Sequence, residues 1–327
     1  MEEHRMDMQY LLTLQGMRDS LGEGVAKVVT TISDVVTSPV FYLIIAFVFW
    51  CVNKKKGLFY IFSLVWANFL NGMLKITFCV FRPWLLNADI RPFDFSMTEA
   101  TGYSFPSGHA TAATAIFGSI AWTERKRKWV LALCVFFALL ICFTRNYLGV
   151  HTPQDVIVGI VSSILCVALF DRLLIWVDRK DGREFWMTGI TLALLLAGLL
   201  YTELRVYPIE LNGENVVDPI SITNDVYSSI GMGIGLMLGW LIEKRWIRFE
   251  VEGTIARKAL RFAVGAVGMV LVYFGLKKVF YAGMGDHWGR LVLYFLTVFY
   301  VMAIYPFFVK KTQDRLNKKA SAAEAEA

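Results

Sequence analysis

The segment RNYLGVHTPQDVIVGIVSSILCVALFDRLLIW, residues 145–176, joins a charged stretch to an apolar run. The run begins near residue 154 and is long enough to cross a bilayer, for which a helix needs roughly 20 residues. The stretch before it carries Arg145, His151 and Asp155. Charged groups within or beside apolar segments are costly and are usually retained for function. The segment therefore predicts a membrane-spanning helix with a functional site at one end.

Apolar runs recur along the whole chain. The chain has 327 residues, of which 56% are hydrophobic, and its mean hydropathy is +0.52. Soluble domains have a more even balance, so these values indicate a polytopic membrane protein. We predict an all-α fold, a polytopic membrane helix bundle of about nine spans. The predicted spans are 38–52, 57–81, 107–122, 129–143, 154–176, 185–201, 226–242, 262–280 and 291–309.

The distribution of lysine and arginine predicts the orientation of this bundle. When Arg172, Lys277 and Lys278, which stand near the ends of their spans, are counted with the adjoining loops, the loops after the first, third, fifth and seventh spans and the C-terminal tail carry 22 of the 33 basic residues. The N-terminal segment and the other loops carry 10. Basic residues are enriched in cytoplasmic loops, so we expect the N-terminus outside and the C-terminus inside. The same clustering accounts for the net charge of +6, and nucleic acid is not an expected partner.

The stretch Lys75-Ile-Thr-Phe-Cys-Val-Phe-Arg82-Pro83 lies at the predicted outer end of the second span. Its two cations are seven residues apart, which is close to two helical turns, so they share one helix face. Two cations on one face can hold a phosphate, and arginine offers a planar fork of donors. The alternative is that both side chains simply extend to the membrane interface, where basic residues are common.

The stretch Pro106-Ser107-Gly108-His109 begins the third span. Free backbone amides and the helix dipole at such an end attract anions, and Gly108 lets the backbone approach a ligand closely. An ordinary helix start is the alternative, because Ser107 is also a good N-cap.

The stretch Thr152-Pro153-Gln154-Asp155 predicts the first turn of the fifth span. Thr152 is the expected cap, Pro153 the first helical residue and Asp155 the acid of a capping box. Asp155 can also hydrogen-bond one nitrogen of His151 and leave the other free as a nucleophile. Both roles can hold at once. On the predicted topology one outer face collects Lys75, Arg82, Ser107, His109, Arg145 and His151.

The order and spacing of the three stretches closely resemble the signature of the type 2 phosphatidic acid phosphatase superfamily. That signature is Lys, six residues, Arg-Pro; then Pro-Ser-Gly-His; then Ser-Arg, five residues, His, three residues, Asp. Every charged and histidine position is present, and Thr144 stands where the family usually has serine. The hydroxyl is retained at that position. The signature covers residues 75–155, and the resemblance of the membrane core extends over roughly 30–176.

The resemblance implies a role for each residue of the signature. His151 would attack phosphorus and form a phosphohistidine, Asp155 would orient it, and His109 would protonate the leaving oxygen. The residues implied in phosphate binding are Lys75, Arg82, Ser107, Gly108 and Arg145. No metal and no cofactor is expected, because fixed cations can stabilise the transferring phosphoryl group and no carboxylate cluster suggests magnesium ligation.

The resemblance also divides the chain. We expect an amphipathic surface segment over 1–33, a six-helix phosphatase core in the membrane over 34–176, additional transmembrane helices over 177–309 and a disordered cytoplasmic tail over 310–327.

The function implied is that of an integral membrane phosphatase for a lipid phosphate or pyrophosphate, such as a phosphatidic acid-like lipid or a polyprenyl pyrophosphate. We expect it in a bacterial plasma membrane, with its site on the extracytoplasmic face and with the lipid substrate and membrane lipids as partners. The sequence indicates no oligomeric state.

Two other functions stay open. One is hydrolysis of a small soluble phosphate such as a sugar phosphate, because nine spans with an outside N-terminus are similar to glucose-6-phosphatase of the same superfamily. The other is an anion-binding transporter without catalysis, although a pore does not need His151 with Asp155 four residues later.

Two motifs outside the signature have simpler interpretations. The glycines Gly231, Gly233, Gly235 and Gly239 superficially resemble a dinucleotide loop, but they lie within an apolar span, which favours close helix packing. A short outer loop between the last two spans carries Asp286, His287 and Arg290. These three residues either line a substrate entrance or form an exposed polar turn.

Overall fold

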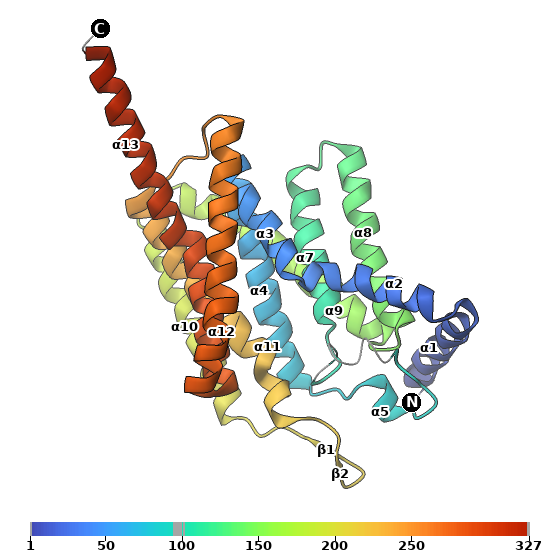
Figure 1. Ribbon diagram of the computed structural model, residues 1–327. Helices are drawn as coiled ribbons and strands as arrows, with labels where there is room; N and C mark the ends of the chain where they lie inside the picture. Colours follow the sequence, from blue (N-terminus) through green and yellow to red (C-terminus); the bar gives the residue numbers. More distant parts are fainter. Residues whose placement is uncertain (1, 94–99, 101, 326–327) are drawn as a thin grey trace.

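The computed structural model describes residues 2–93, 100 and 102–325 (Figure 1). Helices make up nearly all of this part of the chain. The strands found there are β1, Glu210–Leu211, and β2, Glu214–Asn215, which form a small antiparallel hairpin. Residues 94–99 and 101, which belong to the long outer loop predicted over 84–105, lie outside the described residues. The predicted all-α bundle is thus confirmed.

The N-terminal half of the chain contains the helices that carry the predicted site. In chain order its elements are α1 Glu2–Leu21, α2 Glu23–Asp34, the 3-10 turn η1 Val35–Thr37, α3 Pro39–Phe47, the π-helical turn η2 Val48–Val52, α4 Lys54–Phe78, α5 Pro83–Leu86, α7 Gly108–Thr123, α8 Lys128–Tyr147 and α9 Pro153–Asp178.

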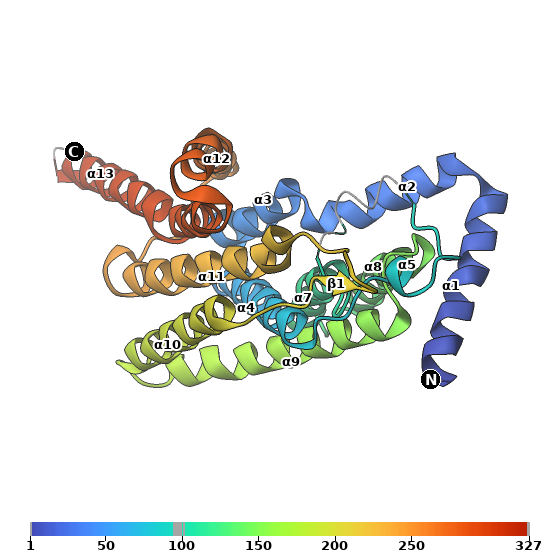
Figure 2. The ribbon, with the colours of Figure 1, turned by 90° about the horizontal axis from the view of Figure 1, so that it is seen from below.

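The C-terminal half packs against α4 and α9 (Figure 2). Its elements are α10 Arg183–Leu204, the β-hairpin, α11 Pro219–Ile242, the π-helical turn η3 Glu243–Ile247, α12 Ile255–Phe299, the π-helical turn η4 Tyr300–Ile304 and α13 Tyr305–Ala325.

Each predicted span coincides with a helical segment. Within the described residues, six segments have the length and apolar composition needed to cross a membrane, and Phe41–Val52 is a shorter apolar helix. The third predicted span is α7, which has 16 residues. The last two spans fall within the single segment Ile255–Lys318. The polytopic membrane bundle is confirmed, and nine crossings remain the number that we predict.

The helix α12 folds back on itself, so it contains the eighth predicted span and the first part of the ninth. Gly285 has φ 75° and ψ 173°, a conformation that interrupts the helix and that glycine adopts without steric cost. The part of α12 before Gly285, its first arm, and the part after it, its second arm, run side by side (Figure 1). The ring centroids of Tyr273 and Tyr294, one from each arm, are 5.8 Å apart. The predicted break between these spans is therefore a tight helical hairpin.

The predicted inner loops meet at one end of the bundle, opposite the β-hairpin and α5. Side chains from the loops after the first, third, fifth and seventh spans form ion pairs with one another. The pairs are Lys54–Glu243, Lys55–Asp178, Lys56–Glu124, Lys244–Asp178 and Arg245–Glu184. Exposed ion pairs contribute little stability, but this set shows that the four loops lie on the same face.

The glycines of α11 lie where another helix comes closest. A Cβ at Gly235 would lie 2.5 Å from the carbonyl oxygen of Phe295, and one at Gly231 would overlap the carbonyl oxygen of Leu291. A Cβ at Gly239 would lie 2.6 Å from the Cβ of Met302. Close packing of α11 against the second arm of α12 and the following turn is therefore confirmed as the reason for these glycines.

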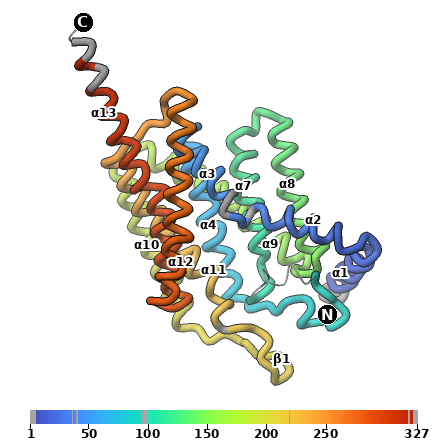
Figure 3. The backbone as a smooth tube through the Cα atoms, in the orientation of Figure 1, coloured from blue at the N-terminus to red at the C-terminus, as the bar shows by residue number. Residues whose placement is uncertain are grey.

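The N-terminal segment forms two helices that cross the site end of the bundle (Figure 3). Gly22, at φ 84°, separates α1 from α2. The Gln15 amide donates to the carbonyl of Asp89 at 3.1 Å, and Arg18 donates to the carbonyl of Arg91. These contacts hold α1 against the loop that follows α5, so the segment is part of the wall around the site.

The C-terminal residues differ from our expectation of a disordered tail. The helix α13 continues to Ala325 and extends away from the other helices (Figure 3). The alanine, lysine and glutamate residues of this segment have high helix propensity, which outweighs its low complexity. Residues 326–327 lie outside the described residues.

Candidate active site

A polar cavity of about 260 Å³ lies at the end of the bundle opposite the ion-paired loops. It brings together residues from all three predicted stretches. The predicted residues that line it are Lys75, Arg82, Gly108, His109, Arg145 and His151. Two others, Ser107 and Asp155, lie directly behind this lining. Residues up to 76 positions apart in the sequence therefore meet around one small volume.

His151 is held from one side by a buried carboxylate. Its Nδ1 lies 3.3 Å from Oδ2 of Asp155, and both side chains are at most 3% exposed. Asp155 also accepts the backbone N–H of Thr152 at 2.8 Å, and its own N–H is capped by the Thr152 hydroxyl. The predicted capping box is thus present. It fixes the carboxylate that orients the imidazole.

The hydroxyl of Ser104 adds a second support to this carboxylate. It donates to Oδ2 of Asp155 at 2.5 Å and lies 3.4 Å from Nδ1 of His151. Ser104 is 1% exposed. The sequence did not indicate this residue, because it stands outside the three stretches.

The other nitrogen of His151 faces Arg82. An N–H at Nη1 of Arg82 donates to Nε2 of His151 at 3.1 Å, so Nε2 carries a lone pair and Nδ1 carries the hydrogen that Asp155 accepts. Burial, and then the positive charge of Arg82, lowers the pKa of His151 well below its usual range. The imidazole is therefore neutral at pH 7, and the lone pair on Nε2 accepts an N–H of Arg82.

The guanidinium of Arg82 is fixed by the backbone around it. Its Nη1 donates to the carbonyl of Val150 at 3.0 Å and its Nε to the carbonyl of Gly102 at 3.2 Å. Pro83 follows as the first residue of α5, so the chain leaves α4 and turns at this point. The alternative that Arg82 extends to the interface does not apply, because the residue is 3% exposed.

His109 contacts a carboxylate that we did not predict. Its Nε2 lies 3.3 Å from Oδ1 of Asp34, at the end of α2, and 3.5 Å from the hydroxyl of Thr37. A carboxylate accepts hydrogen bonds, so Nε2 of His109 carries a hydrogen here. Asp34 therefore orients the imidazole of His109 through this hydrogen bond.

The same α2 end contacts Arg145. The Nη1 atom of Arg145 donates to the Ser33 hydroxyl at 2.8 Å and lies 3.8 Å from Oδ1 of Asp34. Arg145 is 1% exposed, and it comes from the last turn of α8. The N-terminal segment therefore positions one cation and one imidazole of the cavity.

Lys75 is paired with a residue from the C-terminal half. Its Nζ donates to Oδ2 of Asp225, on α11, at 3.0 Å. Ser228 and Arg290 line the same cavity from α11 and α12. The helices after residue 177 thus contribute polar groups to the site, and of these the sequence indicated only Arg290.

Ser107 and Gly108 form the start of α7. The Ser107 hydroxyl accepts the N–H of Ala110 at 3.4 Å, and the Ser107 N–H donates to the carbonyl of Asp155 at 3.0 Å. Ser107 is therefore an N-cap that ties α7 to α9. Gly108 lines the cavity, where an added Cβ would approach only Oδ1 of Asn71, at 3.9 Å.

The short loop predicted between the last two spans has a divided role. Arg290 lines the cavity. The ring of His287 stacks on Tyr227 with centroids 4.7 Å apart, and Asp286 is exposed. Among the described residues no three His, Cys, Asp or Glu side chains are grouped in a way that could hold a metal ion.

Comparison with known proteins agrees with this arrangement. A family model described as PAP2 superfamily matches residues 56–179, and one described as PAP2 superfamily phosphatase, transmembrane extension, matches residues 227–319. The first match contains all eight residues of the predicted site, from Lys75 to Asp155, and the second contains Arg290. No solved structure matches the chain.

Curated relatives match shorter parts of the chain. An undecaprenyl-diphosphatase of Sulfolobus acidocaldarius is 32% identical over 107 residues, which are 33% of this chain and 50% of that protein. Human sphingosine-1-phosphate phosphatase 2 is 39% identical over 85 residues, 24% of this chain and 21% of that protein. Human glucose-6-phosphatase 2 is 25% identical over 185 residues, 49% of this chain and 52% of that protein.

These matches span about half or less of the length of each relative, so they describe a shared core. The two family models are of one superfamily and together match about two thirds of the chain, including the helices that form the cavity. The resemblance inferred from the three stretches is confirmed: the chain belongs to the PAP2 superfamily.

Proposed function

We propose that this integral membrane protein is a phosphatase that hydrolyses a lipid phosphate or pyrophosphate through a phosphohistidine at His151. The observation that carries the proposal is the cavity itself. Two imidazoles with carboxylate partners and three cations of the signature line one small volume. Phosphoryl transfer depends mainly on positioning and on positive charge around the phosphoryl oxygens, and this cavity supplies both.

In the proposed reaction the N–H of Arg82 that Nε2 of His151 accepts turns to a phosphoryl oxygen of the substrate, and Nε2 attacks phosphorus with the lone pair that this frees. The bond from phosphorus to the leaving oxygen breaks, and His109 donates its proton to that oxygen. The charge on the transferring group is stabilised by Lys75, Arg82 and Arg145. Water then attacks phosphorus, His109 takes a proton from that water, and phosphate leaves with His151 restored.

The geometry around His151 supports this assignment. Nδ1 is held by Asp155, so Nε2 is the nitrogen that points to Arg82 and the cavity. A phosphoryl group on Nε2 would have its oxygens within reach of the Arg82 guanidinium, which is 3.1 Å from that nitrogen. Ser107 and the Gly108 amide stand at the start of α7, where the helix dipole favours an anion.

The proposed reaction needs no metal, because the fixed cations supply the positive charge that a metal would. Turnover of the purified protein is expected to remain within about twofold of its initial value after dialysis against EDTA. Phosphate release before and after dialysis measures this. Complete loss of activity that magnesium restores would contradict the cation-based account.

The substrate class is supported by relatives named for lipid substrates, among them the undecaprenyl-diphosphatase and the sphingosine-1-phosphate phosphatase. A small soluble phosphate is the second candidate, since the match to glucose-6-phosphatase 2 extends over 49% of the chain. Phosphate release by the purified protein, measured with EDTA present across a panel of lipid phosphates, polyprenyl pyrophosphates and sugar phosphates, separates the two. We expect kcat/KM for the best lipid to exceed that for any sugar phosphate by about tenfold or more. The opposite order would favour the second candidate.

We further propose that the cavity opens on the extracytoplasmic side of a bacterial plasma membrane. The 22-to-10 division of basic residues supports this orientation, since the loops that carry the larger share meet at the other end of the bundle. The division into an N-terminal segment 1–33, a core 34–176, additional helices 177–309 and a tail 310–327 remains part of the proposal.

Cysteine labelling tests this orientation. Ala88 is exposed in the turn after α5, at the cavity end, and Lys126 is exposed between α7 and α8, at the other end. We expect a membrane-impermeant maleimide to label Ala88→Cys in intact cells and to label Lys126→Cys only after permeabilisation. The unmodified chain is the control, because its own five cysteines are buried or half-buried. The reverse pattern would overturn both the topology and the location of the site.

A further inference from the structure

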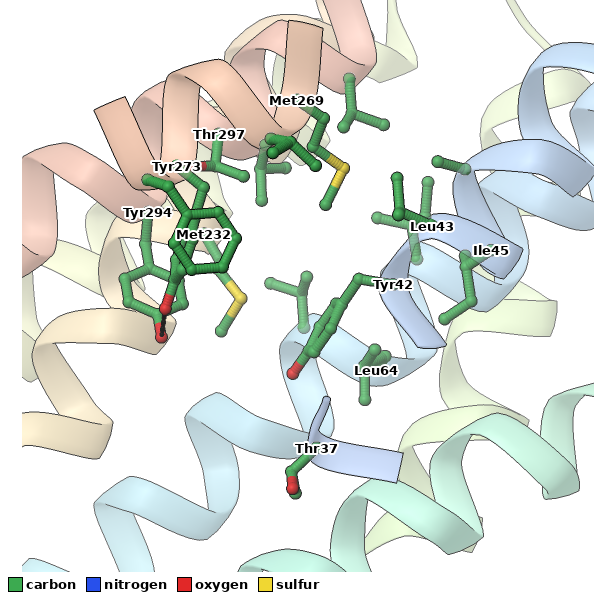
Figure 4. A pocket seen from close by; sticks show the side chains of 17 residues that line it. Thr37, Tyr42, Leu43, Ile45, Leu64, Met232, Met269, Tyr273, Tyr294 and Thr297 are labelled. Carbon is green, nitrogen blue, oxygen red and sulfur yellow. Dashed lines mark hydrogen bonds between the residues drawn. The ribbon is translucent and has the colours of Figure 1, made fainter. Parts of the chain in front are cut away.

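A second, apolar cavity lies between α3, α4, α11 and α12, and we call it the apolar chamber. Its volume is about 160 Å³. Met232 and Met269 project into it from α11 and α12, and Tyr42 projects from α3 on the other side (Figure 4). The remaining wall is almost entirely aliphatic or aromatic, with Leu43, Ile45, Ala46, Ile61, Leu64, Val65, Val270, Phe274, Val298 and Val301.

The apolar chamber adjoins the polar cavity. Four residues line both: Thr37, Tyr42, Met232 and Tyr294. The hydroxyl of Thr37 lies 3.5 Å from Nε2 of His109. A ligand whose leaving oxygen lies near His109 would therefore have its next atoms at the entrance to the chamber.

The chamber also reaches the outer surface of the bundle. Val270 and Phe274 line it from the first arm of α12, and they are 41% and 56% exposed. Both lie within a segment long and apolar enough to span a membrane, so this surface faces lipid. The chamber thus extends from beside the phosphate site to the lipid-facing surface of α12.

We propose that the apolar chamber binds the part of a lipid substrate's hydrocarbon tail that lies next to its phosphate. This proposal rests on the phosphatase function proposed above and specifies its substrate class. Burial of methylene groups against these walls is favourable, whereas sugar hydroxyls would find few hydrogen-bond partners there. From the polar cavity to the chamber, the lining changes from cations to hydroxyls to aliphatic side chains. A lipid phosphate changes in the same order, from its phosphate to its hydrocarbon tail.

This assignment gives the C-terminal helices a role in substrate binding. The first arm of α12 supplies Met269, Val270 and Phe274 to the chamber, and the second arm supplies Thr297 and Val298. The hairpin at Gly285 brings the two arms together around it. The extension after residue 177 is then a part of the lipid site and not only a support for the core.

Filling the chamber tests the proposal kinetically. Ala46 lines the chamber but not the polar cavity and is 2% exposed, so Ala46→Phe places a ring in the tail site. We expect kcat/KM to fall about tenfold or more for dioleoyl phosphatidic acid and to change less than about twofold for dibutyryl phosphatidic acid. The matched control is Ala193→Phe on the exposed face of α10, which should change neither value. Equal activity of Ala46→Phe and the unmodified protein on the long lipid would overturn the proposal.

A binding measurement decides the matter if Ala46→Phe does not fold or if the protein hydrolyses neither lipid. A phosphatidic acid with a photoreactive diazirine in its acyl chain is irradiated with the unmodified protein, and labelled peptides are identified by mass spectrometry. We expect adducts at Met269, Tyr273 and Val298 that excess dioleoyl phosphatidic acid suppresses. Adducts confined to the lipid-facing sides of α8 and α10 would exclude the chamber as the tail site. Labelling of the chamber without any hydrolysis would instead uphold the tail site and reject the phosphatase function.

Discussion

Replacing His151 with alanine is expected to reduce kcat by about 10⁴-fold or more, the scale on which enzymes with an activated nucleophile lose rate when that group is removed. Nε2 of His151 is the atom proposed to bond to phosphorus, and the imidazole contacts both Arg82 and Asp155. Phosphate release from the best substrate of the lipid panel measures the effect.

A second histidine provides the control for this variant. His287 lies on α12, where it contacts the hydroxyl of Thr223, and it does not line the polar cavity. His287→Ala is expected to keep most of the turnover. The melting temperature of both variants shows whether each folds. A folded His151→Ala protein with near-normal turnover would reject the nucleophile assignment.

The variants His109→Ala and Asp155→Asn are expected to fail in different ways. Loss of a general acid costs roughly 10²–10⁴-fold, and most when the leaving oxygen is basic. His109→Ala should therefore slow hydrolysis of an alkyl phosphate far more than that of para-nitrophenyl phosphate, while phosphate binding largely survives. Turnover of the two substrates by each variant provides the comparison.

Asp155→Asn should instead slow both substrates alike. Asp155 accepts the hydrogen on Nδ1 of His151, so its loss disturbs the nucleophile whatever group leaves. Loss of an orienting carboxylate has cost other enzymes about 10⁴-fold. Asparagine still caps a helix, so the melting temperature should change little.

Two results would correct these roles. If Asp155→Asn melts early and its folded fraction works normally, the carboxylate serves only the capping box that it forms with Thr152. If His109→Ala slows both substrates equally, His109 is a phosphate ligand and not the acid.

Much of the fold follows from local patterns in the sequence. Each apolar run predicted as a span is helical, because such a run can satisfy its backbone hydrogen bonds in a membrane only as a helix. The break between the last two spans also follows from the sequence, although its form as a hairpin at Gly285 does not. The C-terminal helix α13 was not predicted, because the low complexity of the tail indicated disorder. Its alanine, lysine and glutamate residues have high helix propensity.

The candidate site was predicted in part, and the reason lies in sequence distance. The predicted site residues stand in three short motifs, and the spacing within each motif indicates a phosphate site. Asp34, Ser104 and Asp225 reach the same site through tertiary packing, and nothing in their immediate sequence distinguishes them from other polar residues. The sequence carries one general indication of their role. Asp34 and Asp225 stand at or near the start of apolar segments, where charged side chains are costly and are usually retained for function.

The most direct test of the central claim is the detection of the phosphorylated enzyme. The protein is mixed with a ³²P-labelled lipid phosphate, quenched in base during turnover, and digested, and the labelled peptide is identified by mass spectrometry. We predict acid-labile, base-stable phosphate on the peptide that contains His151, and none in the His151→Ala variant. Rapid turnover with no labelled peptide, or with phosphate on a residue other than His151, would contradict the account.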